Sequence, residues 1–191
     1  VLMQLVNLMK DGKPVKMSKR TGKAITLVDL LDEVPIDAVR FLFNMREAGS
    51  AMDFDLDLAV EQSNQNPVYY CQYAHARICS ILRKLENEGV KIRKPEKAEL
   101  TLLSSDEETD LIAHLASLTN VIIFAANSYD PARITHYATE LATKFHRFYN
   151  AQRVMVDDEA LMQARIFLCE CVKRTMKNVL SMLKINAPES M

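Results

Sequence analysis

Long segments with helical periodicity, separated by few chain-breaking residues, constrain the fold of this chain more than any other feature. Apolar side chains recur at helical spacing from Leu58 to about Glu88, where Pro67 must start a new helix or kink the existing one. Comparable patterns run from Ser105 to about Asn127, from Asp130 to about Val154 and from Glu159 to Leu183. Ser105 and Glu108 are predicted to form a capping box, and Asp130 and Pro131 to supply an N-cap and a first-turn proline. With only four glycines and no tryptophan in 191 residues, the chain is predicted to be mostly α, with these segments forming a helical bundle.

The first 57 residues follow a different pattern. The segment from Leu2 to Met9 is apolar and typical of a short strand, and the stretch from Lys10 to Lys23 predicts a mobile basic loop. Two short helices should follow, one opened by a capping box of Thr26 and Asp29 and the other by Pro35. Because the first residue is valine and lies inside the strand-like run, we expect the chain to begin within a domain.

The charge of the chain is nearly balanced but unevenly distributed. The formal net charge of −1 gives no reason by itself to propose a nucleic-acid partner. Between Lys10 and Lys23, however, six basic residues and one acid give a local net charge of +5. The four cysteines show no paired CxxC spacing, and neither a signal peptide nor an apolar run of 18 residues is present. We therefore expect a reducing, cytoplasmic compartment and no membrane.

The run Lys16-Met17-Ser18-Lys19-Arg20 lies in the middle of the basic loop. Polyphosphate binding needs several cationic donors on a flexible segment, because charge-assisted hydrogen bonds to phosphate are strong. Lys16, Lys19 and Arg20 supply such donors. A P-loop is excluded, because Met17 stands where that motif requires glycine. The alternative interpretation is a solvated basic loop without a ligand.

The predicted helix after Pro67 has two distinct faces. Tyr70, Tyr73, Arg77 and Lys84 gather roughly 130° from the apolar stripe, if each residue turns the helix by about 100°. Aromatic rings interleaved with cations suit unstacked bases, because rings stack on bases while Arg and Lys meet phosphate. The alternative is that this face packs on a neighbouring domain. The apolar stripe consists of Cys71, His75, Ile78, Leu82 and Leu85.

No metal site is predicted. Cys71, His75 and Cys79 are spaced by four residues, but they lack a fourth ligand and lie on the apolar stripe, so we interpret them as core residues. His146 stands among apolar residues and is also expected to be structural. In the acidic segment Met52–Asp57, an aspartate at position 55 or 57 is expected to be a helix N-cap rather than a metal ligand.

Several segments resemble a known family. The Lys16–Arg20 run resembles the KMSKS signature loop of class I aminoacyl-tRNA synthetases and differs only in Arg20, which replaces the final serine. Further segments resemble, in the same order, parts of arginyl-tRNA synthetases, and the similarity covers nearly the whole chain; the linker from Val90 to Thr101 matches least. These segments are Asp37–Phe41, Asp53–Asp57, Gln62–Pro67, Tyr69–Arg77, Phe145–Asn150 and Ala187–Met191.

The resemblance implies an organisation and an activity. Residues 1–57 would be the end of a catalytic domain and residues 58–191 a helical anticodon-binding domain. The activity would be ATP-dependent activation of arginine, with Mg²⁺, and its transfer to tRNA(Arg). Lys16 and Lys19 would bind the ATP phosphates and stabilise the leaving pyrophosphate, with Met17, Ser18 and Arg20 assisting. Tyr70, Tyr73, Arg77 and Met191 would contact tRNA, with Met191 on a free tail after Pro188.

Two rival functions remain open. One is a non-catalytic tRNA- or protein-binding helical module, and the other is a class I synthetase for another amino acid, such as cysteine or methionine. The HIGH-type signature and the strands that would bind adenine and arginine do not occur in these 191 residues. The segment alone is therefore expected to be inactive. We expect a monomer.

Overall fold

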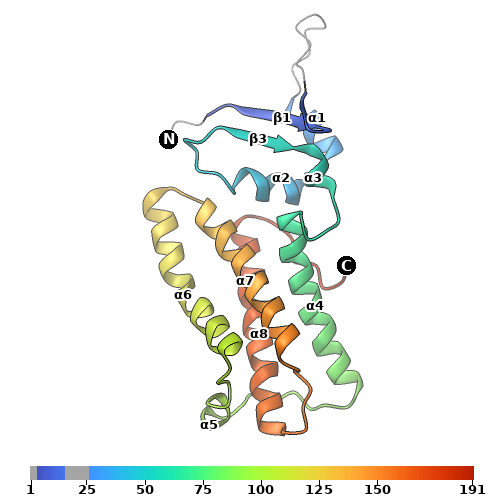
Figure 1. Cartoon of the computed structure of the whole chain (residues 1–191), viewed down its shortest axis with the longest axis vertical. Helices are drawn as coiled ribbons and strands as arrows, with labels where there is room; N and C mark the ends of the chain where they lie inside the picture. Colours follow the sequence, from blue (N-terminus) through green and yellow to red (C-terminus); the bar gives the residue numbers. More distant parts are fainter. Residues whose placement is uncertain (1–3, 16–25) are drawn as a thin grey trace, which may run out of the picture.

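The computed structural model describes residues 4–15 and 26–191, and within them the chain is mostly helical, as predicted. The molecule is elongated, with a small sheet and three short helices at one end and a bundle of long helices below them (Figure 1). The elements at the sheet end are β1 Val6–Lys10, β2 Lys13–Pro14, α1 Leu27–Glu33, α2 Ile36–Phe43, β3 Met52–Asp55 and α3 Leu56–Val60. The bundle comprises α4 Pro67–Asn87, α5 Lys97–Leu100, α6 Asp106–Ser128, α7 Ala132–Ala151 and α8 Glu159–Met182.

The three strands form one sheet in the order β2-β1-β3, of which the sequence predicted only β1. β2 pairs antiparallel with β1 through a two-residue turn, where Asp11 and Gly12 have φ of 51° and 69°. Positive φ at both turn residues is typical of a tight hairpin, so the stretch predicted to be a loop contains a strand. β3 pairs parallel with β1. The acidic segment hid this strand, in which Met52 and Phe54 are buried while Asp53 and Asp55 point outward.

Local capping signals placed most helix starts correctly. Thr26 and Asp29 form the predicted capping box of α1, and Ser105 and Glu108 form that of α6. Asp55 accepts hydrogen bonds from the backbone N–H groups of residues 57 and 58 and caps α3, also as predicted. A new helix starts at Pro67. Caps are reliable signals because they satisfy backbone donors that a helix terminus leaves without partners.

Two details of the helices differ from the prediction. The cap position of α7 is Pro131 rather than Asp130, although the Asp130 side chain still accepts a hydrogen bond from the backbone N–H of Ala132. The charged linker contains the short helix α5. The expected domain division between residues 57 and 58 falls inside α3 and stays a prediction.

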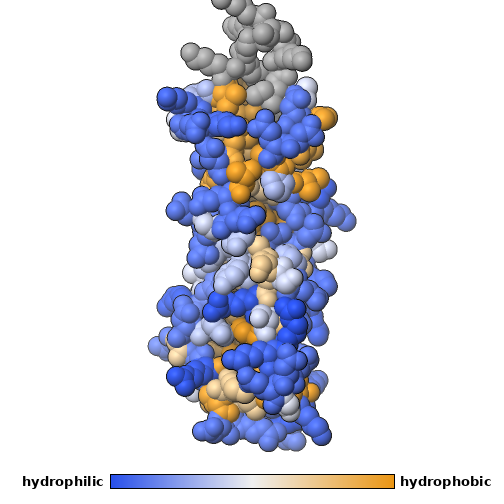
Figure 2. Space-filling view, turned by 90° about the vertical axis from the view of Figure 1, so that its right-hand side faces the viewer, coloured by the Kyte–Doolittle hydropathy of each residue, from blue (hydrophilic) through white to orange (hydrophobic). Residues whose placement is uncertain are grey.

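The core of the bundle lies between α4, α7 and α8, whose apolar stripes face one another. α4 also packs on α2, so the same helix connects the sheet end with the bundle. Figure 2 shows apolar surface at the sheet end. The exposed apolar residues of this end include Leu5, Leu27 and Val28. The fully buried large side chains of the bundle include Ile78, Leu111, Leu141, Phe145, Phe148, Ile166, Met176 and Leu180.

Helix α6 is the most peripheral of the long helices and packs chiefly along α7 (Figure 1). By length and composition it could cross a membrane, since its most apolar window has a mean hydropathy of 1.5 and only 11% of that window is buried. Such a helix is weak evidence for a membrane span. Its first turn carries three acids, and one of them, Glu108, is buried against Arg165 of α8.

Candidate nucleic-acid interface

The predicted phosphate-binding residues Lys16, Met17, Ser18, Lys19 and Arg20 lie outside the described residues. The structure describes the two segments that flank them, the β1-β2 hairpin and helix α1. These flanks are joined by an ion pair between Lys10 Nζ and Glu33 Oε2, 3.7 Å apart. The assignment of this loop to ATP therefore stays a prediction.

The two predicted faces of α4 are present. The apolar stripe is buried in the bundle and consists of Cys71, His75, Ile78, Leu82 and Leu85. Arg77 and Lys84 lie on the other side, which is partly open to solvent, and Tyr73 lies there with them. The helix thus uses one face for the core and offers another to a ligand.

Tyr73 and Arg77 form a fixed pair one helical turn apart. Arg77 donates a hydrogen bond from Nη1 to the Tyr73 hydroxyl at 2.7 Å. Its guanidinium carbon also lies 4.7 Å from the ring centroid of Tyr149 on α7, within the range of a cation–π contact. Since both contacts restrict rotation of the Arg77 side chain, the cation is held in place before any ligand binds.

Tyr70 is half-buried, and its role as a tRNA contact stays a prediction. Its ring packs on the core and lies 5.0 Å from the ring of His146, measured between centroids. His146 also stacks on Tyr73 at 5.9 Å, so it lies between the two tyrosines. Burial, followed by the charge of Arg77, lowers the pKa of His146. Tyr70 and His146 together support Tyr73 from behind.

The tail after α8 is bound along α4, which corrects the prediction of a free tail after Pro188. Three α4 side chains donate hydrogen bonds to tail carbonyl oxygens: Gln72 to Asn186 at 2.9 Å, His75 Nδ1 to Pro188 at 2.8 Å, and Arg83 to Glu189 at 2.9 Å. The sequence did not show this, because the tail is held through its backbone and its side chains carry little of the signal. The arrangement leads Met191 to the open face of α4.

A hollow of about 360 Å³ lies where this face, α7 and the tail meet. We call it the central hollow. It brings together three of the four predicted tRNA-contacting residues, Tyr73, Arg77 and Met191, and Lys84 lines it as well. The remaining lining residues are Ala76, Ser80, Ile81, Arg83, Tyr149 and Ser190. A ring face, a soft thioether and three cations around one hollow can hold a flat base and its phosphate.

Comparison with known proteins assigns the helical part of the chain. Residues 71–191, more than half of the chain, match the model of the DALR anticodon-binding domain. The chain belongs to this family.

Two relatives of this DALR domain are both described as arginine–tRNA ligases. The chain is 55% identical over 191 residues to the arginine–tRNA ligase of Caldanaerobacter subterraneus subsp. tengcongensis, and 50% identical to that of Ruminiclostridium cellulolyticum. Each alignment covers 100% of this chain and 34% of the relative. The chain thus spans about a third of the length of the curated relatives it matches.

Solved structures agree on the fold. A Campylobacter jejuni protein provisionally assigned as an arginyl-tRNA synthetase superposes with a TM-score of 0.82 at 30% identity, over 100% of this chain and 40% of its own. The Thermus thermophilus arginyl-tRNA synthetase superposes with a TM-score of 0.72 at 23% identity, over 96% of this chain and 34% of its own. The second match supports the fold alone.

Sequence reasoning missed Tyr149 and Arg83 as residues of the central hollow in this DALR domain. Tyr149 belongs to the run Phe145–Asn150, in which residues 145 and 148 are fully buried and residue 149 is half-buried at the edge of the core. An aromatic residue beside a buried aromatic pair was the available signal. Arg83 lies near Arg77 and Lys84 along the same helix.

Cys71, His75 and Cys79 of the DALR domain are core residues, as predicted. Burial raises the pKa of both the Cys71 and the Cys169 thiol to about 12. Burial also lowers the pKa of His75, whose Nε2 has no hydrogen-bond partner in the described structure.

Proposed function

We propose that this chain is part of a cytoplasmic arginine–tRNA ligase and that the central hollow binds the anticodon loop of tRNA(Arg). The observation that carries the proposal is the hollow itself, in which Tyr73, Arg77 and Met191 meet although 114 residues separate Arg77 from Met191. The curated relatives named above, which are identical to this chain at half or more of its 191 positions, support arginine as the amino acid.

The genetic code makes one base a suitable target. All arginine codons have G in the middle, so every arginine tRNA has C at the centre of its anticodon. In this proposal the central cytosine leaves the stack and packs against Tyr73, while Arg77 contacts its backbone and Met191 closes over it. Lys84 lies about 10 Å along the helix from Arg77, since seven residues separate them.

The other half of the proposed function concerns ATP and rests on the residues 16–20. Lys16 and Lys19 would bind the phosphates of Mg²⁺-bound ATP and stabilise the charge that develops as pyrophosphate leaves, with Met17, Ser18 and Arg20 completing the loop. The adenine and arginine sites would lie in the remaining two thirds of the protein, which this chain does not include.

One experiment tests the amino acid and the enzyme class together. The full-length protein is incubated with ATP, pooled tRNA and each amino acid in turn. Charging with arginine alone is the expected result. Charging with another amino acid would make the protein a different class I synthetase, and charging with none would favour a non-catalytic RNA-binding module.

A further inference from the structure

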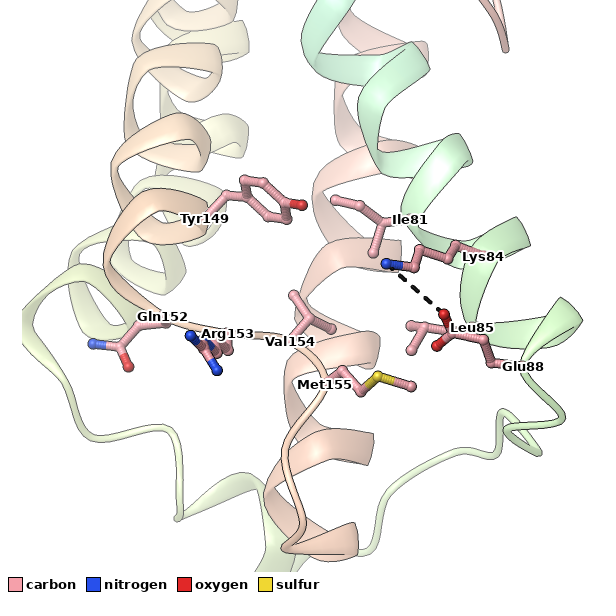
Figure 3. Close-up of a pocket in the computed structure, with 9 residues that line it drawn as sticks. All are labelled: Ile81, Lys84, Leu85, Glu88, Tyr149, Gln152, Arg153, Val154 and Met155. Carbon is pink, nitrogen blue, oxygen red and sulfur yellow. Dashed lines mark ion pairs between the residues drawn. The ribbon is translucent and has the colours of Figure 1, made fainter.

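A second hollow of about 370 Å³ lies beside the central hollow, between the C-terminal half of α4 and the segment that follows α7 (Figure 3). We call it the distal hollow. Ile81, Lys84 and Tyr149 line both hollows, so the two adjoin. In Figure 3, Tyr149 points from α7 toward Ile81 on α4, with Met155 below them on the following segment.

The lining of the distal hollow suits a flat ligand that carries negative charge at its edge. Leu85 and Val154 are buried and form an apolar floor, while the Tyr149 ring and the exposed Met155 side chain form walls. A thioether and a phenol ring are favourable surfaces for an unstacked base. The overall volume falls within the usual range of ligand pockets, roughly 300–1,000 Å³.

Two cations stand at the rim. The Arg153 guanidinium makes no hydrogen bond or ion pair with the part of the chain that the structure describes. Lys84 pairs with Glu88, but the two charged atoms are 3.8 Å apart and both side chains are exposed. Exposed pairs of this kind contribute little, so Lys84 can turn to a phosphate at small cost. The rim therefore complements a nucleic-acid backbone.

The segment that carries Arg153 and Met155 forms one wall of the distal hollow and is held by hydrogen bonds from a buried side chain. Arg165 of α8 donates a hydrogen bond from Nη1 to the carbonyl oxygen of Arg153 at 2.7 Å and one from Nη2 to the Gln152 side chain at 2.9 Å. Arg165 is itself buried and paired with Glu108. A connecting segment held by a buried ion pair is preorganised, which lowers the entropic cost of binding a ligand there.

From this geometry we propose that the distal hollow binds a second unstacked nucleobase of the same RNA loop, next to the one in the central hollow. Tyr149 separates the two bases, and Lys84 and Arg153 contact the phosphates that join them. The inference rests on the proposed function, because it requires a single RNA strand that follows α4. In this arrangement Lys84 contacts two nucleotides and does not merely lie at the edge of the site for one.

The test uses the full-length protein and hairpins of the arginine tRNA anticodon arm in which each loop base is removed in turn to leave an abasic site. Loss of the central base should weaken wild-type binding, and loss of one adjacent base should also weaken it, each by roughly 5- to 100-fold, as expected for one base–aromatic stack. Dissociation constants are measured at one fixed salt concentration.

Two variants assign the two bases to the two hollows. Met155→Asp places a carboxylate in the distal hollow and should reduce the penalty of the adjacent abasic site to about twofold or less, while the penalty at the central site remains. Tyr73→Ala should give the opposite pattern. Met182→Asp is the matched control, because Met182 on α8 is exposed to nearly the same extent, 48% against 46% for Met155.

Each outcome has a distinct meaning. If neither adjacent abasic site weakens wild-type binding while the central one does, the distal hollow does not bind a base, although the proposed function stands. The same conclusion follows if Met182→Asp weakens binding as much as Met155→Asp, since the effect is then one of charge alone. If no abasic site matters and Tyr73→Ala has no effect, the proposed anticodon site itself is wrong.

Discussion

Arg165 on α8 donates a 2.7 Å hydrogen bond from Nε to Oε1 of Glu108 in the first turn of α6, and both side chains are buried. Buried ion pairs cost desolvation, and their removal as a pair is often tolerated, whereas removal of one partner leaves a buried charge uncompensated. This relationship joins three parts of the bundle, because Arg165 also binds the segment after α7.

Replacement of Arg165 by alanine should therefore destabilise the protein by about 3–5 kcal/mol. Urea unfolding of the full chain measures the effect. The double variant Arg165→Met, Glu108→Gln should recover much of the loss, because no charge is then left unpaired. The control is Lys84→Ala, which removes an exposed pair with Glu88 and should change the midpoint little. A loss as large for Lys84 as for Arg165 would contradict this account.

The Arg165–Glu108 ion pair also predicts how the stability of the protein depends on pH. Burial raises the pKa of Glu108, but hydrogen bonds from the Ser105 backbone N–H and from Arg165 more than offset this, and the net pKa is lowered from its usual value of 4.5. A carboxylate with a lowered folded-state pKa contributes stability above its unfolded pKa and loses it as the pH falls through the folded value. Stability should thus decline below about pH 4.5. Glu108→Gln should flatten that decline, as followed by the unfolding midpoint against pH.

In the central hollow, Tyr73→Ala should weaken binding of an arginine tRNA anticodon stem-loop by roughly 1–3 kcal/mol. Its effect should be smaller on a stem-loop with a central G, since the stack on the correct base is what is lost. Arg77→Ala should act alongside it and make the salt dependence shallower if its partner is a phosphate. Equal losses of binding affinity on both RNAs would mean that Tyr73 supports the site in general and does not select the central base.

The bound tail gives a prediction about its anchor on α2. Asp37 Oδ2 accepts hydrogen bonds from Gln72 and from both the backbone and the side chain of Asn186, at 3.0, 3.2 and 3.1 Å. Asp37→Ala should release the tail and weaken stem-loop binding by about 1 kcal/mol, while helical content stays unchanged. Asp32→Ala, on the exposed side of α1, is the control. Faster proteolysis of the tail in the Asp37 variant alone would connect the loss to tail release.

For the phosphate loop, Lys19→Ala in the full-length protein should lower kcat by the equivalent of roughly 2–4 kcal/mol, because the lost charge acts mainly in the transition state. Pyrophosphate exchange at saturating ATP measures the activation step. Control measurements of the thermal midpoint should show an unchanged fold. An unaltered rate would refute the assignment of Lys19.

Most of the fold could be predicted from local signals, and the failures have a common cause. Capping residues and Pro67 act within one turn of the chain, so sequence alone located the helices well. Strand β3 depends on pairing with β1, 46 residues away, and its two outward aspartates look like a loop. Whether such a segment forms a strand depends on partners far away in the sequence, and the pattern of the segment itself does not identify those partners.

The candidate site likewise combines residues that local patterns predicted with residues that depend on tertiary packing. Helical spacing placed Tyr73, Arg77 and Lys84 on one face, and it also included Tyr70, whose ring packs on His146 of another helix. The contribution of Tyr149 and the path of the tail depend on tertiary packing and backbone carbonyl groups, which side-chain patterns do not reveal. A residue that supports a site and one that touches a ligand can therefore share the same periodic signal.

The peripheral position of α6 should let it open locally while the two hollows keep their geometry. Because α6 packs chiefly on α7, with its first turn fastened by Glu108, its middle can open locally while α4, α7 and α8 stay folded. Amide hydrogens near Thr119 should then exchange faster than those near Ile78, which lies in the fully buried stripe. Both hollows are built from α4, α7, the segment after α7 and the C-terminal tail, none of which belongs to α6, so their geometry should persist through many such openings.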